Sequence, residues 1–198
     1  MPPRTSNFAR QKDDFYPSPP GVIDALLKHV YIPDGIIWEC AAGDGALLEQ
    51  LEAAGRTVVA SDLIDRGHPD VVPRVDFLME TALPPGCKCV ITNPPFRLAD
   101  EFIRKGLDLG AEQVILLLPL KFIGATGADR WENTRRISDI LLMGRLKMLP
   151  PGAVDKGLNP TVDFAWFVFR QDPQVGCRLF NSKSNKVFNE YTAEAHNG

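Results

Sequence analysis

A chain of 198 residues has the length of one α/β domain with at most a small addition. Hydrophobic residues make up 44% and charged residues 24%, which are the proportions of a soluble globular protein. We expect no membrane partner, because no apolar run is long enough to cross a bilayer and the polar start of the chain lacks the apolar core of a signal peptide. The formal net charge of −3 argues against a broad, non-specific grip on nucleic acid, although it allows a local basic face.

The cysteine pattern argues against a disulfide framework and against a metal site. Cys87 and Cys89 have no second pair at the spacing of a zinc site, and Cys40 lies in an apolar stretch. We therefore expect all four cysteines, Cys177 included, to be reduced in a cytoplasmic protein that needs no metal.

The first predicted helix follows a proline-rich segment. Residues 1–14 are polar with scattered positive charge, and we expect a flexible N-terminus there. Apolar side chains recur on one helical face over residues 22–30, and Pro19 suits the entry to that helix. On these residues alone, Tyr16 and Ser18 belong to a helix cap.

A strand, a glycine-rich loop and a helix follow in that order. Residues 36–40 are a predicted buried strand, residues 41–45 break it with two glycines, and residues 46–54 are a predicted helix. Glycines at such a turn let a ligand approach the backbone where a Cβ atom would block it. The next strand, over residues 57–60, leads to Asp62, about 20 residues beyond the loop, where an acid can hold both hydroxyls of a ribose.

The glycine loop by itself leaves two cofactor types open, because the same arrangement also fits a nicotinamide dinucleotide. The loop reads Glu39-x-Ala41-x-Gly43-x-Gly45, so the third glycine of the dinucleotide pattern is missing. Glu39 also ends the first strand with a carboxylate, where it would meet a cationic amino-acid group. Both features favour S-adenosylmethionine.

The most informative stretch is the apolar strand that includes residues 90–92, which is followed by Asn93, Pro94, Pro95 and Phe96. Two successive prolines cannot continue a sheet ladder, because neither has an N–H and both fix φ. The result is a stiff turn at the carboxyl end of a strand, where ligands bind in open α/β sheets. Two carbonyl acceptors and a flat ring suit a planar heterocycle that carries an amino group. The plain alternative is a strand-ending loop with an incidental aromatic.

Helices and strands alternate again in the second half of the chain. We expect a helix over residues 98–109 and strands over residues 114–119, 140–148 and 163–169, the first of them buried on both faces. Such alternation indicates right-handed βαβ units and a mostly parallel sheet. A loop over residues 149–160 joins the last two strands at the predicted ligand edge.

Positive charge gathers near this loop, around one tryptophan. It suits a rim that contacts phosphates. A solvated helix face is the alternative, because acidic residues dilute the charge. The residues concerned are Lys121, Arg130, Trp131, Arg135, Arg136, Arg145 and Lys147.

The order of the motifs resembles that of class I S-adenosylmethionine-dependent methyltransferases, above all the adenine-N(6) DNA type with an Asn-Pro-Pro-Phe motif. Tyr-Pro-Ser-Pro at residues 16–19, the glycine loop, Asp62, Asp76 and the turn at residues 93–96 occur in the family's order. The resemblance implies a Rossmann-like α/β fold whose mostly parallel, seven-stranded sheet has helices on both faces. Ser18 departs from the family's threonine but keeps the hydroxyl.

The resemblance also implies roles for individual residues. Asn93 and the carbonyl of Pro94 would accept hydrogen bonds from the amino group of adenine, Phe96 would stack on the base, and Pro95 completes this catalytic turn. The cofactor-binding residues implied in the same way are Tyr16, Ser18, Pro19, Glu39, Ala41, Gly43, Gly45, Asp62, Asp76 and Phe77.

On this basis we divide the chain into a flexible N-terminus (1–14), a methyltransferase catalytic domain (15–170) and a poorly ordered C-terminal tail (171–198). Methyltransferases with this motif order usually carry a long target-recognition domain, and we expect none within these 198 residues. The expected partners are nucleic acid, DNA before RNA, and a separate specificity protein.

Other functions stay open at this point. The same turn serves methyltransferases that act on glutamine side chains or on adenine in structured RNA. A nicotinamide oxidoreductase would need an acid/base pair that does not accompany the turn. A non-catalytic module would bind nucleic acid without transferring a methyl group.

Overall fold

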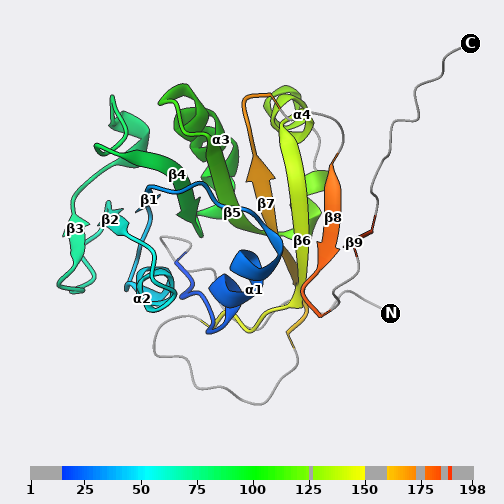
Figure 1. Cartoon of the computed structure of the whole chain (residues 1–198), viewed down its shortest axis with the longest axis horizontal. Coiled ribbons are helices and arrows are strands. Elements are labelled where there is room, and N and C mark those ends of the chain that lie inside the picture. Colours follow the sequence, from blue (N-terminus) through cyan, green and yellow to red (C-terminus); the bar gives the residue numbers. More distant parts are fainter. Residues whose placement is uncertain (1–14, 125–126, 150–159, 173–176, 184–186, 189–198) are drawn as a thin grey trace, which may run out of the picture.

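The computed structural model describes residues 15–124, 127–149, 160–172, 177–183 and 187–188. These residues form a nine-stranded sheet in the order β3-β2-β1-β4-β5-β7-β6-β8-β9 (Figure 1). The strands are β1 (Ile36–Glu39), β2 (Val58–Asp62), β3 (Val71–Pro73), β4 (Cys87–Thr92), β5 (Gln113–Pro119), β6 (Ile137–Arg145), β7 (Asp163–Phe169), β8 (Arg178–Asn181) and β9 (Val187–Phe188). The helices are α1 (Val22–His29), α2 (Ala46–Ala53), α3 (Ala99–Asp108) and α4 (Ala128–Arg135), with short 3₁₀ turns η1 (Phe77–Met79), η2 (Phe96–Leu98) and η3 (Leu120–Gly124).

Strand direction divides the sheet into two parts. β3, β2, β1, β4 and β5 run parallel to one another, whereas β7 is antiparallel to both β5 and β6. β8 is parallel to β6, and β9 is antiparallel to β8. The expected Rossmann-like α/β fold with a mostly parallel sheet is therefore confirmed. The strand number differs from the expected seven, because β8 and β9 extend the sheet beyond β6.

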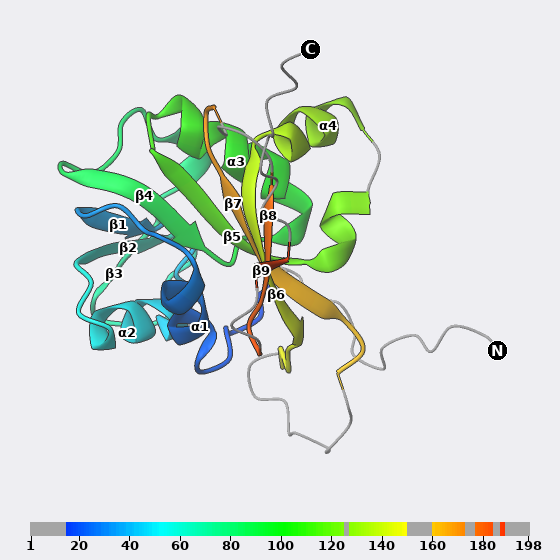
Figure 2. The same cartoon turned by 45° about the vertical axis from the view of Figure 1, so that its right-hand side comes forward.

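Helices cover both faces of the sheet, as expected (Figure 2). On one face, α1 and α2 pack on a cluster that includes Ile37 of β1 and Ile91 of β4. On the other face, α3 and η3 pack on a cluster that includes Trp38 and Val90. Neighbouring residues of β1 and of β4 thus enter opposite clusters, because side chains alternate along a strand.

Strand β5 confirms the prediction of a strand buried on both faces, since every residue from Gln113 to Pro119 is buried. Its partner β7 is buried from Phe164 to Phe169. Trp166 of β7 is fully buried, and its Nε1 donates to the carbonyl oxygen of Val22 at 3.1 Å. That bond fixes α1 against the sheet, and α1 follows the segment that reaches the pocket described below.

Two parts of the sheet were not predicted. No strand was predicted at β3, because its three residues are too few to show an alternating pattern. β8 and β9 lie in the expected tail, and β8 pairs with β6 over four residues. Residues 1–14, the loop residues 150–159, and residues 173–176, 184–186 and 189–198 of the tail lie outside the described residues, so the expectations for them stay predictions.

An ion pair joins β8 to the sheet. Asp139 of β6 is fully buried, and Nη2 of Arg178 lies 2.6 Å from its Oδ1. We expect Arg178→Met to lower the free energy of unfolding by up to about 3 kcal/mol, because a buried carboxylate loses its counter-charge. That value is at the low end of the range for buried pairs, since Arg178 is itself half-exposed.

Equilibrium unfolding in urea measures this difference, and Arg145→Met is the matched control. Arg145 and Asp163 are both exposed and lie 3.9 Å apart, so the control should change the free energy of unfolding by less than about 1 kcal/mol. Equal losses in the two variants would contradict a role for the Arg178 pair in holding β8.

Candidate functional site

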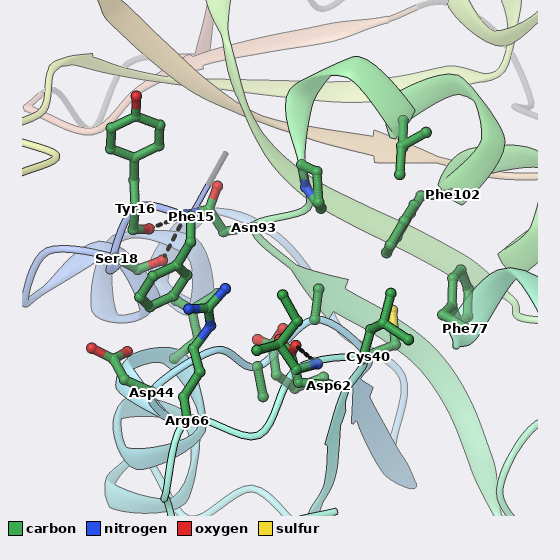
Figure 3. Close-up of a pocket in the computed structure, with 18 of the residues that line it drawn as sticks. Phe15, Tyr16, Ser18, Cys40, Asp44, Asp62, Arg66, Phe77, Asn93 and Phe102 are labelled. Carbon is green, nitrogen blue, oxygen red and sulfur yellow. Dashed lines mark hydrogen bonds between the residues drawn. The ribbon is translucent and has the colours of Figure 1, made fainter. Parts of the chain in front are cut away.

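A pocket lies at the edge of the sheet where the parallel strands β1, β2 and β4 end (Figure 3). Glu39 is the last residue of β1, Asp62 is the last residue of β2, and Asn93 directly follows β4. This is the edge at which ligands bind in open α/β sheets. The predicted site residues that line the pocket are Tyr16, Ser18, Glu39, Ala41, Asp62, Asp76, Phe77, Asn93 and Pro95.

Other predicted site residues lie beside the pocket and not on its lining. Pro19 faces α2, where its carbonyl oxygen accepts a bond from Nε2 of Gln50 at 3.3 Å. Pro94 is buried. The full set beside the pocket is Pro19, Gly43, Gly45, Pro94 and Phe96.

Asp62 holds the glycine loop in place. Its Oδ2 accepts a hydrogen bond from the backbone N of Gly43 at 2.7 Å, and its Oδ1 accepts one from the N of Ile64 at 2.7 Å. Gly43 and Gly45 have φ angles of 60° and 88°, a backbone conformation that side chains with a Cβ atom rarely adopt. Asp62 therefore shapes the loop as well as lining the pocket.

Two side chains of the protein lie close to the backbone of these glycines, in the space that a Cβ atom would need. A Cβ atom at Gly43 would lie 2.2 Å from the ring of Phe15, and one at Gly45 would lie 2.3 Å from the ring of His68. The guanidinium of Arg66 stacks on the Phe15 ring at 3.9 Å from its centroid. A ligand that contacted the backbone of Gly43 would therefore displace Phe15.

Glu39 is one of the residues that line the pocket and is fully buried. Burial is the main reason why the pKa of this carboxyl is raised from 4.5 to about 8, and the negative charge of the nearby Asp62 contributes to the same rise. The Thr92 hydroxyl and the Ala41 backbone act in the opposite direction, but neither carboxyl oxygen has a well-aligned hydrogen bond within the described residues. A cationic group in the pocket would compensate this carboxylate.

The side chain of Asn93 is oriented by the segment before α1. Its Nδ2 donates to the carbonyl oxygen of Tyr16 at 3.0 Å and to Oγ of Ser18 at 3.2 Å (Figure 3). Its Oδ1 is buried and has no partner among the described residues. The side chain therefore presents one unused acceptor at the end of β4.

The two prolines end β4 as predicted, and a short 3₁₀ turn follows. The carbonyl oxygen of Pro95 accepts a hydrogen bond from the N of Leu98 at 2.8 Å. The rings of Phe96 and Tyr16 are parallel, with an interplanar angle of 1° and centroids 6.4 Å apart. Phe96 also packs on Phe164 of β7 at 5.9 Å.

Asp76 and Phe77 form another wall of the pocket. Oδ1 of Asp76 accepts a hydrogen bond from the N of Leu78 at 3.0 Å and caps η1. Phe77 is buried against Trp38 and Phe102, with ring centroids 5.1 Å and 4.9 Å away. Phe77 thus belongs both to the hydrophobic core and to the pocket lining.

The predicted basic rim is partly neutralised by acidic neighbours. Arg130 donates to both oxygens of Asp100, stacks on Phe122, and is mostly buried. This bidentate pair lowers the pKa of Asp100 against the opposing effect of burial, which is the largest single influence on it. By contrast, Arg97 is exposed at the mouth of the pocket and makes no ion pair with another described residue.

Sequence reasoning missed several residues of the pocket. Leu63 and Ile64 directly follow Asp62, so their place next to a predicted ligand residue was a usable signal. Phe15 and Arg66 gave no such signal, because their contact depends on how two separate loops cross. Arg97 follows the Asn-Pro-Pro-Phe turn immediately and could have been included on that ground.

Within the described part of the chain, no three His, Cys, Asp or Glu side chains gather in a way that could hold a metal ion. The helices described there are too short or too polar to cross a membrane. The four cysteines carry no disulfide bond.

No protein-family model and no curated protein matches the chain. Solved structures match its fold. One is a dimethyladenosine transferase from Plasmodium falciparum, with 15% identity and a TM-score of 0.51 over 77% of this chain and 61% of that chain. Another is a candidate hemolysin from Lactococcus lactis, with 12% identity and a TM-score of 0.52 over 78% of this chain and 87% of that chain.

A third is the modification subunit of a candidate type I restriction enzyme from Vibrio vulnificus, with 12% identity and a TM-score of 0.50 over 80% of this chain. The match covers 45% of that subunit, so this chain spans less than two thirds of both the subunit and the dimethyladenosine transferase. At these identities the similarity concerns the fold alone, and the fold is the Rossmann-like one found in class I methyltransferases.

The buried carboxyl of Glu39 leads to a prediction about pH. Its pKa is about 8 in the folded protein and near 4.5 when exposed, so the folded state binds this proton more tightly. The contribution of Glu39 to the free energy of unfolding is therefore largest below pH 4.5, where the carboxyl is protonated in both states. It is lost as the pH rises to about 8. In Glu39→Gln this dependence is absent.

Urea unfolding of both proteins across this pH window tests the prediction. The free energy of unfolding of the wild type, minus that of Glu39→Gln, should fall as the pH rises through the window and become constant above it. Two parallel pH curves would show that Glu39 titrates normally in the folded protein.

Proposed function

We propose that the protein is an S-adenosylmethionine-dependent methyltransferase that methylates the exocyclic amino group of adenine in DNA. The observation that carries this proposal is the hydrogen bonding of the Asn93 side chain. Both of its amide hydrogens are directed at acceptors within the protein, while Oδ1 is buried without a partner among the described residues. An amino hydrogen of a planar base would satisfy that acceptor.

The pocket residues fit the proposed cofactor. Glu39 offers a buried carboxyl without a well-aligned partner, and the ammonium group of the amino-acid part would favour its ionised form. Asp62 would accept from the ribose hydroxyls, because a carboxylate has about four acceptor sites and two of them are used by backbone N–H groups. Asp76 would accept from the amino group of the cofactor's adenine, and Phe15 would move from Gly43. When bound, S-adenosylmethionine supplies an electrophilic methyl group.

The protein's part in the reaction is to orient the amine that attacks this methyl group. The lone pair of an adenine amino group is delocalised into the ring. Acceptance of its hydrogens by Oδ1 of Asn93 and by the carbonyl of Pro94 would favour a more tetrahedral, nucleophilic nitrogen. The stiff turn would then align the nitrogen with the methyl carbon, and such positioning carries much of the rate.

A base within a duplex must first rotate out of the stack, which costs a few kcal/mol. Stacking on Phe96 would offset roughly 1–3 kcal/mol of that cost. Phe96 is itself held by Phe164 and lies parallel to Tyr16, so the ring is already fixed before a base arrives. The exposed cation of Arg97, next to this ring, suits a neighbouring phosphate.

The choice of nucleic acid as substrate is supported by two observations. The Asn-Pro-Pro turn carries a phenylalanine where methyltransferases acting on glutamine often have a tyrosine. Two structural neighbours are named as a dimethyladenosine transferase and as a modification subunit of a restriction enzyme.

We also propose a cytoplasmic location and a separate partner that supplies target specificity.

Two other functions are the alternatives to test. Methylation of adenine in RNA or of glutamine side chains would use the same turn with a different acceptor. A non-catalytic module would bind nucleic acid and leave labelled methyl groups untransferred. A tritiated-methyl assay on DNA, RNA and protein fractions, followed by nucleoside digestion, separates these outcomes.

We expect Asn93→Ala to lower kcat by about 10²-fold or more, by analogy with loss of one preorganised polar group in other enzymes. Binding of S-adenosylmethionine, measured by calorimetry, should stay unchanged. The control is Asn181→Ala at the end of β8, whose Oδ1 caps a turn by accepting from the N of Lys183 at 2.9 Å. Unchanged turnover in Asn93→Ala would remove Asn93 from the mechanism.

A further inference from the structure

Residues 16–18 contact the end of β4 across a long separation in sequence. Ser18 lies 75 residues before Asn93, yet its hydroxyl oxygen accepts from Nδ2 of Asn93 at 3.2 Å (Figure 3). Ser18 is only 9% exposed. Water therefore has little access to replace this bond.

The direction of the Asn93 amide follows from the chemistry of its two acceptors. The carbonyl oxygen of Tyr16 can only accept, so the NH2 group must face it at 3.0 Å. If the amide were flipped, its oxygen would face another oxygen. The Ser18 hydroxyl can donate or accept, so it does not choose the direction, but it takes up the second hydrogen and stops the side chain from swinging.

The segment that carries these acceptors is itself stiff and anchored. Pro17 and Pro19 flank Ser18 and fix their own φ angles, and Pro19 also restricts Ser18 to extended conformations. The carbonyl of Pro19 is held by Gln50 of α2. The Ser18 hydroxyl is therefore presented to Asn93 from a fixed position.

We infer that Ser18 is a positioning residue: its hydroxyl, with the Tyr16 carbonyl, holds the Asn93 amide so that Oδ1 is presented to the reacting amine. This inference rests on the proposed function. It assigns Ser18 to the part of the site that would hold the amine substrate. The family resemblance instead implies that Ser18 contacts the cofactor. The two roles differ in what the loss of the hydroxyl should change.

The test is a comparison of Ser18→Ala with Ser18→Thr in the full chain. Loss of one hydrogen bond to a positioned group is worth about 0.5–1.5 kcal/mol, so kcat should fall by roughly 2- to 12-fold in Ser18→Ala. The affinity for S-adenosylmethionine should stay unchanged, and Ser18→Thr should restore kcat because it restores the hydroxyl.

Ser61→Ala is the matched control. Its hydroxyl oxygen accepts from Nε1 of Trp38 at 2.9 Å, is also buried, and lies off the pocket lining. Like Ser18→Ala, it removes a buried hydroxyl acceptor from a side-chain N–H, so it shows what the lost bond does to folding. We expect kcat to stay unchanged in this variant.

Asn93→Asp gives a second, independent comparison. Aspartate keeps an acceptor oxygen but has no N–H to donate, so one of its oxygens would face the Tyr16 carbonyl. We expect kcat to fall by at least the factor seen in Ser18→Ala. Full activity of Asn93→Asp would overturn the inference, because the donor half of the side chain would then be dispensable.

The side-chain NH2 signals of Asn93 in a ¹⁵N-labelled sample test the geometry without any turnover. They should shift and exchange faster with water in Ser18→Ala, and stay in place in Ser61→Ala. Unchanged signals would overturn the inference, as would a loss of S-adenosylmethionine affinity at constant kcat. Failure of the wild type to bind S-adenosylmethionine would instead refute the proposed function, and the NH2 signals would still decide whether Ser18 orients Asn93.

Discussion

Parallel pairing of β1 with β2 and with β4 is the constraint on which the site depends. Because these strands run in one direction, their carboxyl ends meet, and Glu39, Asp62 and Asn93 are brought to one edge although they are far apart in sequence. In an antiparallel arrangement, the carboxyl ends of neighbouring strands would lie at opposite edges of the sheet. The antiparallel pairs that involve β7 lie beyond β5, where they contribute packing and the contact of Phe164 with Phe96.

The parallel part of the sheet was predictable except for β3, because its longer strands have strong local signals. β5 is a continuous apolar run, and β4 ends at two prolines that cannot extend a ladder. β3 and β8 could not be predicted in this way. Each has only three or four residues, and their positions are set by pairing with β2 and β6 and, for β8, by the ion pair to Asp139, all of which are tertiary interactions.

The sequence predicted which residues meet at the pocket where a residue lies at a strand end, and it missed the pocket residues whose position depends on how loops cross. Glu39, Asp62 and Asn93 each take their position from the strand before them, so the chain order was sufficient. The contact of Arg66 with Phe15 and the bonds from Asn93 to residues 16–18 join segments that no periodicity relates. Motif order could indicate that residues 16–18 belong to the site, but not which group they would touch.

Some of the buried polar groups that lack a partner in the described residues lie on the pocket lining, where a ligand could supply one. A buried donor or acceptor that lacks its partner costs about 1–3 kcal/mol, so a fold keeps such groups at a loss of stability. On the pocket lining, the carboxyl of Glu39 at the end of β1 and Oδ1 of Asn93 after β4 are in this state, and so is the Nε donor of Arg66. The first suits a cation and the second suits an N–H donor. Two ligands that supply a cation and an N–H donor would therefore regain stability at β1 and β4, which are neighbours in the sheet. The proposed cationic methyl donor and the amine that receives the methyl group fit this requirement better than a single dinucleotide does.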